Sequence, residues 1–185
     1  MWAALGAFFV ATAAFLFAVA GHRVGLGGSA LFLVLVLAAK LRLEQRADDA
    51  IRWLRGARAE EAVGDTLNEL RREGWTLMHD VVQRGEGNID HIASGPNGVY
   101  LIETKCRAYK DETQLTKVKR QAAKLHEELG VWVTPVICLH ERRGNAFRTK
   151  GVWVVPRVQL LDWLRAQRNQ PVPFDRLARY ADSVE

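Results

Sequence analysis

The sequence predicts an α/β fold in residues 46–185, preceded by a hydrophobic helical segment, residues 1–45. Short apolar runs rich in β-branched residues, separated by glycine and asparagine clusters, recur between residues 75 and 156, which is typical of strands. Two segments, 48–73 and 116–129, carry apolar residues at helical spacing. Strands interspersed with amphipathic helices favour a sheet covered by helices.

The N-terminal segment is almost wholly apolar. Residues 1–39 contain one basic side chain, Arg23, and no acidic one. Residues 1–20 are long enough to cross the hydrocarbon core of a bilayer, and a second apolar run covers 24–39. Lysine and arginine follow the second run, which by the positive-inside rule places the next domain in the cytoplasm. We expect a two-span hairpin in the cell membrane, contacting lipid through residues 1–39.

A secretory signal peptide is the competing interpretation of this segment. It lacks a basic region at its start and leaves the second apolar run unexplained. The net charge of the chain is +5, an excess that fits a nucleic-acid partner or an anionic lipid surface without requiring either. Two cysteines, Cys106 and Cys138, make no disulfide framework and favour a reducing compartment.

The helix expected over 48–73 bears a candidate acidic residue. At about 100° per residue, Val63, Leu67 and Leu70 form one stripe, and Glu60 falls within it. A carboxylate on the buried stripe can reach a site formed by the strands that follow. The first of these strands is expected at residues 75–83.

Residues 87–105 predict two strands joined by a tight turn, because a Gly-Pro-Asn-Gly cluster separates two apolar, β-branched runs. Side chains alternate along a strand, so Glu103 and Lys105 share one face with Val99 and Leu101. A buried charge costs several kcal/mol unless it is paired or bound to a metal. Two charged side chains on this apolar face therefore indicate that Glu103 and Lys105 have a functional role.

Asp90, on the first of these strands, can lie across the turn from Glu103 and supply a second carboxylate. Together with the Thr104 carbonyl, these groups form the hard oxygen environment that Mg²⁺ or Mn²⁺ prefers. Lys105, facing the same way as Glu103, can contact a water or phosphate at such a site. The alternative interpretation is a salt bridge between Glu103 and Lys105 on a solvated edge strand.

The helix expected over 116–129 buries a stripe of apolar residues. Polar residues flank that stripe and can contact nucleic-acid phosphates if the helix borders the site, although solvated side chains are their usual meaning. They are Lys117, Arg120, Gln121 and Lys124. Further strands are expected at 131–140 and 151–156, and short helices around 159–167 and 174–183.

Three short motifs of the sequence resemble those of the nuclease-related domain (NERD) family, which belongs to the PD-(D/E)xK nuclease-like superfamily. They are Gly-Asn-Ile-Asp-His-Ile from Gly87, Pro-Asn-Gly-Val-Tyr from Pro96, and Leu-Ile-Glu-Thr-Lys from Leu101. The resemblance implies a restriction-endonuclease-like αβββαβ core, a mixed sheet flanked by helices, with the acidic pair and the lysine on the central hairpin. It also implies that Glu60 and Gln121 lie near the active site.

We therefore expect a membrane-anchored nuclease that hydrolyses phosphodiester bonds of nucleic acid, DNA in preference to RNA, with Mg²⁺ or Mn²⁺ as cofactor. Expected catalytic residues are Asp90, Glu103, Lys105, Glu60 and Gln121, and expected metal ligands are Asp90, Glu103 and Thr104. Two other classes stay open: a catalytically inactive nuclease-fold module that binds nucleic acid or a protein at the membrane, and a bilayer scaffold that only oligomerises.

Overall fold

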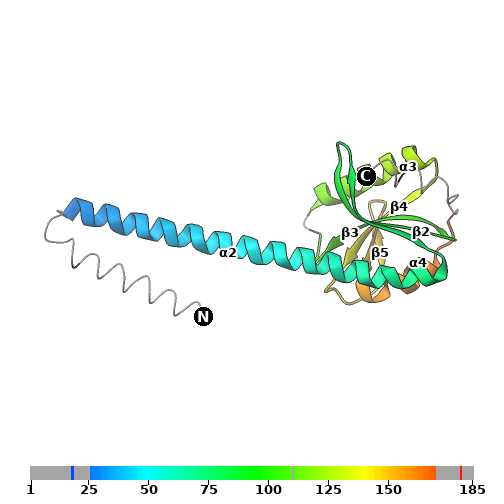
Figure 1. Ribbon diagram of the computed structural model, residues 1–185, viewed down its shortest axis with the longest axis horizontal. Helices are drawn as coiled ribbons and strands as arrows, with labels where there is room; N and C mark the ends of the chain where they lie inside the picture. The colour runs from blue at the N-terminus through cyan, green and yellow to red at the C-terminus, as the bar shows by residue number, and fades with distance from the viewer. Residues whose placement is uncertain (1–17, 19–25, 110, 170–179, 181–185) are drawn as a thin grey trace. The chain divides into compact units, whose positions relative to one another are not determined.

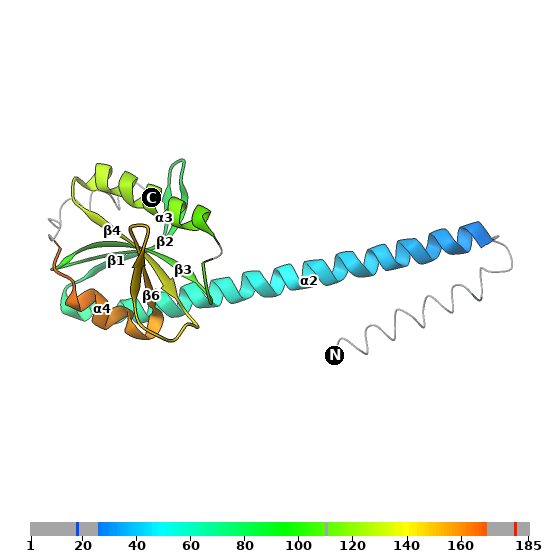
Figure 2. The same cartoon turned by 180° about the vertical axis from the view of Figure 1, so that it is seen from behind.

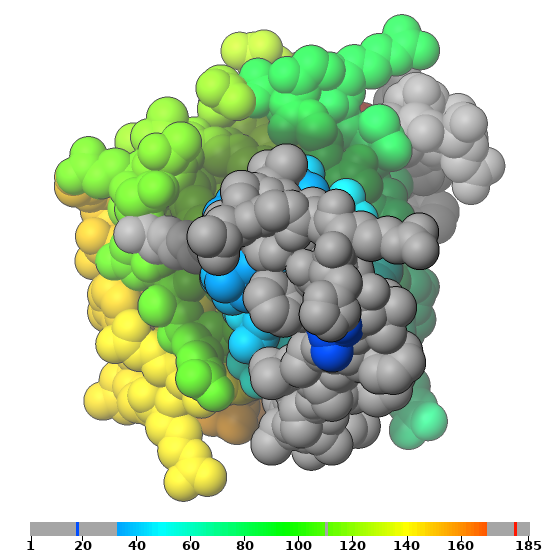
Figure 3. Space-filling view, turned by 90° about the vertical axis from the view of Figure 1, so that its left-hand side faces the viewer, coloured from blue at the N-terminus to red at the C-terminus, as the bar shows by residue number. Residues whose placement is uncertain are grey.

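A computed structural model describes residues 26–109 and 111–169, together with Ala18 and Tyr180, and gives the side chains from Leu33 onward. The residues outside this description are grey in Figure 3. The chain divides into two compact units, residues 1–53 and 54–185.

The expected membrane segment falls mostly outside this description. The first span, residues 1–20, lies outside it apart from Ala18. Among the residues that the structure does describe, no helix is both long enough and apolar enough to cross a bilayer. The second expected span, 24–39, is therefore not supported. The helix expected at 174–183 also lies outside the description apart from Tyr180.

The helix before the sheet, α2, runs over Leu26–Asn68, and a 3-10 turn, η1, covers Glu69–Glu73. Gly74 ends the turn with φ +81°, a left-handed conformation that glycine adopts without steric cost. The predicted stripe of Val63, Leu67 and Leu70 is fully buried.

Glu60 does not lie on that buried stripe as expected. Its side chain is exposed, and the neighbouring Ala59, only 1% exposed, takes the buried position. The physical reason is helical phase, since one residue moves a side chain by about 100° and a small alanine suits the close contact.

Six strands form one mixed sheet in the order β1-β2-β3-β4-β6-β5. The bounds are β1 Thr76–Gln83, β2 Gly87–Gly95, β3 Gly98–Lys105, β4 Val133–Leu139, β5 Phe147–Thr149 and β6 Val152–Pro156. β1, β2 and β3 are antiparallel neighbours, β3 is parallel to β4 and β4 to β6, and β5 is antiparallel to β6. The predicted α/β class with a mixed sheet flanked by helices is confirmed.

The helix after the hairpin, α3, covers Glu112–Leu129 and begins four residues earlier than expected. The side chain of Asp111 accepts hydrogen bonds from the main-chain nitrogens of Thr113 and Gln114, which caps the first turn at that point. After β6, a 3-10 turn, η2 (Arg157–Gln159), leads into α4 (Leu160–Ala166).

Helices cover both faces of the sheet, as Figures 1 and 2 show. On one face, Val99 and Leu101 of β3 pack with the apolar stripe of α3. On the other face, Tyr100 and Ile102 pack with the end of α2 and with α4. The alternation of β3 thus divides its side chains between two cores, and both cores hold this strand in the middle of the sheet.

Candidate active site

A fork between β2 and β3 carries the first acidic residue. β2 pairs with β3 from His91, opposite Ile102, up to the turn, whereas residues 87–89 pair with β1. Asp90 lies where the two strands separate. Its Oδ2 accepts a hydrogen bond of 2.6 Å from the main-chain nitrogen of Thr104, so the carboxylate satisfies a donor that the interrupted strand pairing leaves open.

The β1–β2 ladder is also interrupted at this level. His79 pairs with His91 and Val81 with Ile89, and Asp80 between them has φ +52°, a conformation that few non-glycine residues adopt. Such local distortions change the direction of side chains and are frequent at functional sites. The irregular backbone of Asp80 thus lies on the strand next to Asp90, between the pairs on either side of it.

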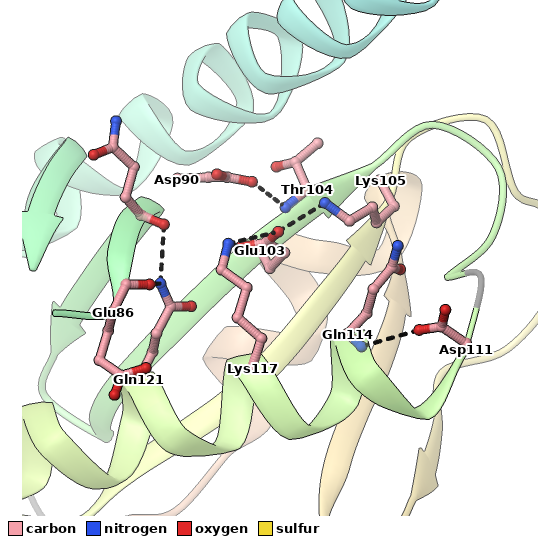
Figure 4. A network of polar contacts seen from close by, with 10 residues as sticks. Glu86, Asp90, Glu103, Thr104, Lys105, Asp111, Gln114, Lys117 and Gln121 are labelled. Carbon is pink, nitrogen blue, oxygen red and sulfur yellow. Dashed lines mark hydrogen bonds and ion pairs between the residues drawn. The ribbon is translucent and has the colours of Figure 1, made fainter.

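The second acidic residue, Glu103, is 5% exposed and faces α3. Its Oε1 accepts a hydrogen bond of 2.7 Å from the ammonium of Lys105, and its Oε2 lies 3.3 Å from the ammonium of Lys117 (Figure 4). The salt bridge of the alternative interpretation is present. However, β3 lies between β2 and β4, so the pair is not on an edge strand.

The acidic side chains influence one another. Burial, and then the charge of Glu103, raise the pKa of Asp90 to about 7, although the hydrogen bond from the Thr104 nitrogen opposes both. Burial also raises the pKa of Glu60, with Lys105 lowering it and Glu103 raising it. The structure thus brings Glu60, although exposed, into the electrostatic field of the hairpin charges.

Glu60 and Asp90 line a common cavity of about 260 Å³ on the α2 side of the sheet. His79 and His91 line it too, and their Nδ1 atoms lie 2.8 Å apart. Burial, and then the neighbouring His79, lower the pKa of His91 to about 4. A neutral His91 can share a hydrogen bond with His79.

Polar side chains on one flank of α3 form hydrogen bonds and an ion pair with residues 84–88. The amide nitrogen of Gln121 donates to the carbonyls of Asn88, at 2.9 Å, and of Glu86, at 3.3 Å. Lys124 donates to the carbonyl of Arg84, and Arg120 pairs with the carboxylate of Glu86. These three side chains tie α3 to the β1–β2 hairpin.

Sequence reasoning missed two parts of this arrangement. It assigned Lys117 to phosphate contacts, but not to the carboxylate of Glu103, fourteen positions away. The contact between His79 and His91, twelve positions apart, was not predicted either. The one available signal was the position of Lys117 beside the apolar stripe of α3, which faces the same side of β3 as Glu103.

The described part of the chain holds no group of three or more His, Cys, Asp or Glu side chains that could hold a metal ion. The expected ligands include only two such side chains, Asp90 and Glu103, with a main-chain carbonyl as third donor. The chemistry of this set fits a hard divalent cation, because all three donors are oxygen atoms. Burial first, and then the charge of Glu103, raise the pKa of Asp90, and a bound cation would oppose both.

The nuclease-related domain, NERD, is the family whose model matches this chain, over residues 55–140. The match includes the end of α2, the three antiparallel strands, α3 and β4, and therefore Glu60, Asp90, Glu103 and Lys105. No curated protein and no solved structure matches the chain. Residues 55–140 are thus similar to a nuclease-related domain.

Proposed function

We propose that the chain is a metal-dependent nuclease that hydrolyses phosphodiester bonds of nucleic acid, with DNA as its substrate. One observation carries the proposal. The carboxylates of Asp90 and Glu103 come from neighbouring strands, the charge of Glu103 raises the pKa of Asp90, and the ammonium of Lys105 lies 2.7 Å from Glu103. The match to a nuclease-related domain supports the same chemistry.

Asp90, Glu103 and the Thr104 carbonyl are the groups that would hold Mg²⁺ or Mn²⁺. When bound, the cation supplies Lewis-acid activation of water and of the scissile phosphate. The hydrogen bond from the Thr104 nitrogen fixes the orientation of the Asp90 carboxylate. Glu60, which lines the same cavity as Asp90, adds negative charge and a proton acceptor on the α2 side.

Lys105 positions the attacking water and stabilises the negative charge that develops on the phosphate. Its side chain is 27% exposed, so it can reach a substrate while held against Glu103. Lys117, 37% exposed, lies on the other side of the same carboxylate and contacts a backbone phosphate. Gln121 acts as a positioning residue, because it holds the hairpin strand that carries Asp90.

Cleavage of plasmid DNA, linear DNA and RNA by the 185-residue chain tests the proposal, with Mg²⁺, Mn²⁺ or EDTA. We expect cleavage of DNA with either metal, no cleavage in EDTA, and a loss of at least about 100-fold in Glu103→Gln. Glu127→Gln, an exposed acid on α3, is the matched control. Equal rates for wild type and Glu103→Gln with both metals would rule the enzyme out.

Lys105→Ala separates the roles within the site. This variant keeps both carboxylates, so its affinity for Mn²⁺ in calorimetric titration should stay within a few-fold of wild type while turnover falls. Loss of metal affinity together with turnover would contradict a separate role for Lys105.

A non-catalytic binding module is the second candidate. Both lysines neutralise Glu103 in the structure, which favours a nuclease fold that binds nucleic acid or a protein partner without cleaving it. Thermal melting distinguishes the two. The nuclease predicts stabilisation by Mg²⁺, about 2.7 kcal/mol at one hundred times the dissociation constant, that disappears in Asp90→Asn. The module predicts no Mg²⁺ dependence in either protein.

The proposal includes a membrane anchor in residues 1–39 and a cytoplasmic location for residues 46–185. Its support is the near absence of charge in the first of these segments and the basic residues after it. We expect the protein to stay with membranes through alkaline carbonate extraction. Release into the supernatant would contradict the anchor.

A further inference from the structure

A second cavity, of about 280 Å³, lies beside α3 and is separate from the residues around Glu103. Lys119 contributes to it, about 200° around the helix from Lys117, so the two lysines serve opposite flanks of α3. Small apolar side chains of α3 and the first residues of β4 make its floor. Trp132, His126 and Arg148 complete the lining.

Trp132 gives this cavity an aromatic wall. The side chain is 59% exposed, although a tryptophan of a folded domain is on average highly buried. Its ring centroid lies 6.1 Å from that of His126, and Nδ1 of His126 is 2.7 Å from the carbonyl oxygen of Val131. The histidine is therefore anchored to the backbone beside the indole.

Two positive charges of the cavity have no ion-pair partner in the part of the chain that the structure describes. Neither Lys119 nor Arg148 forms an ion pair with any described residue, whereas other basic residues near them are paired. Lys117 pairs with Glu103, and Lys150 with Glu112. None of the described residues that line the cavity is acidic. The cavity therefore combines an exposed aromatic ring with an uncompensated positive charge.

We infer that this cavity binds a segment of single-stranded nucleic acid, with an unpaired base stacked on Trp132 and its phosphates held by Lys119 and Arg148. Any base offers a π face to an aromatic side chain, and basic residues beside the ring follow the phosphates, so such a site binds without sequence preference. A paired base is stacked within its duplex and cannot take this position.

The inference rests on the proposed function for nucleic acid as the ligand. It requires neither a bound cation nor cleavage, because its residues lie apart from Asp90 and Glu103. The site would hold the strand on one flank of α3 while the hairpin on the other flank carries the catalytic groups. Its failure can therefore be distinguished from a failure of the nuclease proposal.

The test is the affinity of the 185-residue chain for a fluorescein-labelled twelve-nucleotide oligothymidylate, measured by anisotropy in EDTA. We expect Trp132→Ala to weaken binding by roughly 5- to 100-fold. Trp53→Ala is the matched control, since Trp53 is 72% exposed and lies outside the cavity. An unchanged melting temperature of each variant shows that it is folded.

The double variant Lys119→Ala/Arg148→Ala tests the phosphate contacts separately. Its logarithmic plot of affinity against salt should be shallower by about 1.4 than that of wild type, because two contacts to a single strand are lost. An oligothymidylate annealed to its complement should bind without dependence on Trp132. Equal affinities of wild type and Trp132→Ala for the single strand, or the same Trp132 dependence for the duplex, would overturn the inference.

Results for the two proposals are read together. Binding that depends on Trp132 in a protein that cleaves nothing would support this site and overturn the nuclease proposal. Metal-dependent cleavage in a protein whose affinity is unaffected by Trp132→Ala would overturn this site alone.

Discussion

Replacing Gln121 tests the link between α3 and the hairpin that carries Asp90. The side chain is 0% exposed, and its amide nitrogen donates to the carbonyls of Glu86 and Asn88. Each such hydrogen bond contributes about 1 kcal/mol net, so Gln121→Leu loses about 2 kcal/mol from this source. The amide oxygen has no hydrogen-bond partner among the described residues, and its removal recovers part of that loss. The net cost should be about 1 kcal/mol.

Gln121→Glu keeps the shape of the side chain but replaces the donor with an acceptor. It places a buried carboxylate against two carbonyl oxygens, and a buried charge without a partner costs about 3–5 kcal/mol. The glutamate variant should therefore be much less stable than the leucine variant at neutral pH. It should recover at acid pH, where a protonated glutamate can donate one hydrogen bond again.

Urea unfolding followed by circular dichroism measures these free energies. Glu127→Leu, at an exposed position of the same helix, controls for a general effect on α3. Equal costs for Gln121→Glu and Gln121→Leu would refute the assigned direction of the hydrogen bonds. A folded Gln121→Leu protein that loses cleavage about 100-fold would show that catalysis needs the link between α3 and the strand that carries Asp90.

Three further predictions concern single positions. A methyl group on Gly95 would lie 2.3 Å from the Trp75 ring, so Gly95→Ala should lower the free energy of unfolding by about 1–3 kcal/mol. The same change at Gly56, a helical position with nothing within 4 Å, should raise it by about 0.5–1 kcal/mol. Both are measured by urea unfolding, and an opposite order would contradict the packing. Burial raises the pKa of Cys138 to about 12, so a thiol reagent should label Cys106 alone in the native protein and both cysteines in urea, as mass spectrometry would show. Native labelling of Cys138 would contradict its burial.

Patterns of apolar and turn residues within short segments were enough to predict most of the helices and strands. The hairpin over residues 87–105 could be predicted because strand alternation and turn residues act between near neighbours. The stripe of α3 could be predicted for the same reason, since a helical face repeats every three to four residues. The start of α3 at Glu112 and the short strand β5 were missed. An aspartate cap and a three-residue edge strand give weak signals in a sequence.

The candidate site was predicted in its composition but not in its contacts. Glu103 and Lys105 stand two residues apart on one strand, so their shared face follows from the backbone. Glu60 was expected on the buried stripe of α2, but it is exposed and the neighbouring Ala59 is buried, because successive side chains point about 100° apart on a helix. The hydrogen bond from Thr104 to Asp90 depends on where two strands separate, which no local pattern encodes.

The amino-acid sequence by itself determined the α/β class, the hairpin and the charges that this hairpin carries. Only the tertiary structure decided that Lys117 meets Glu103, that Gln121 holds the β1–β2 hairpin, and that Trp132 and Arg148 line one cavity. The physical reason is separation along the chain. Alternation and helical period act within a few residues, whereas these contacts form only when sheet order and helix packing have brought distant segments together.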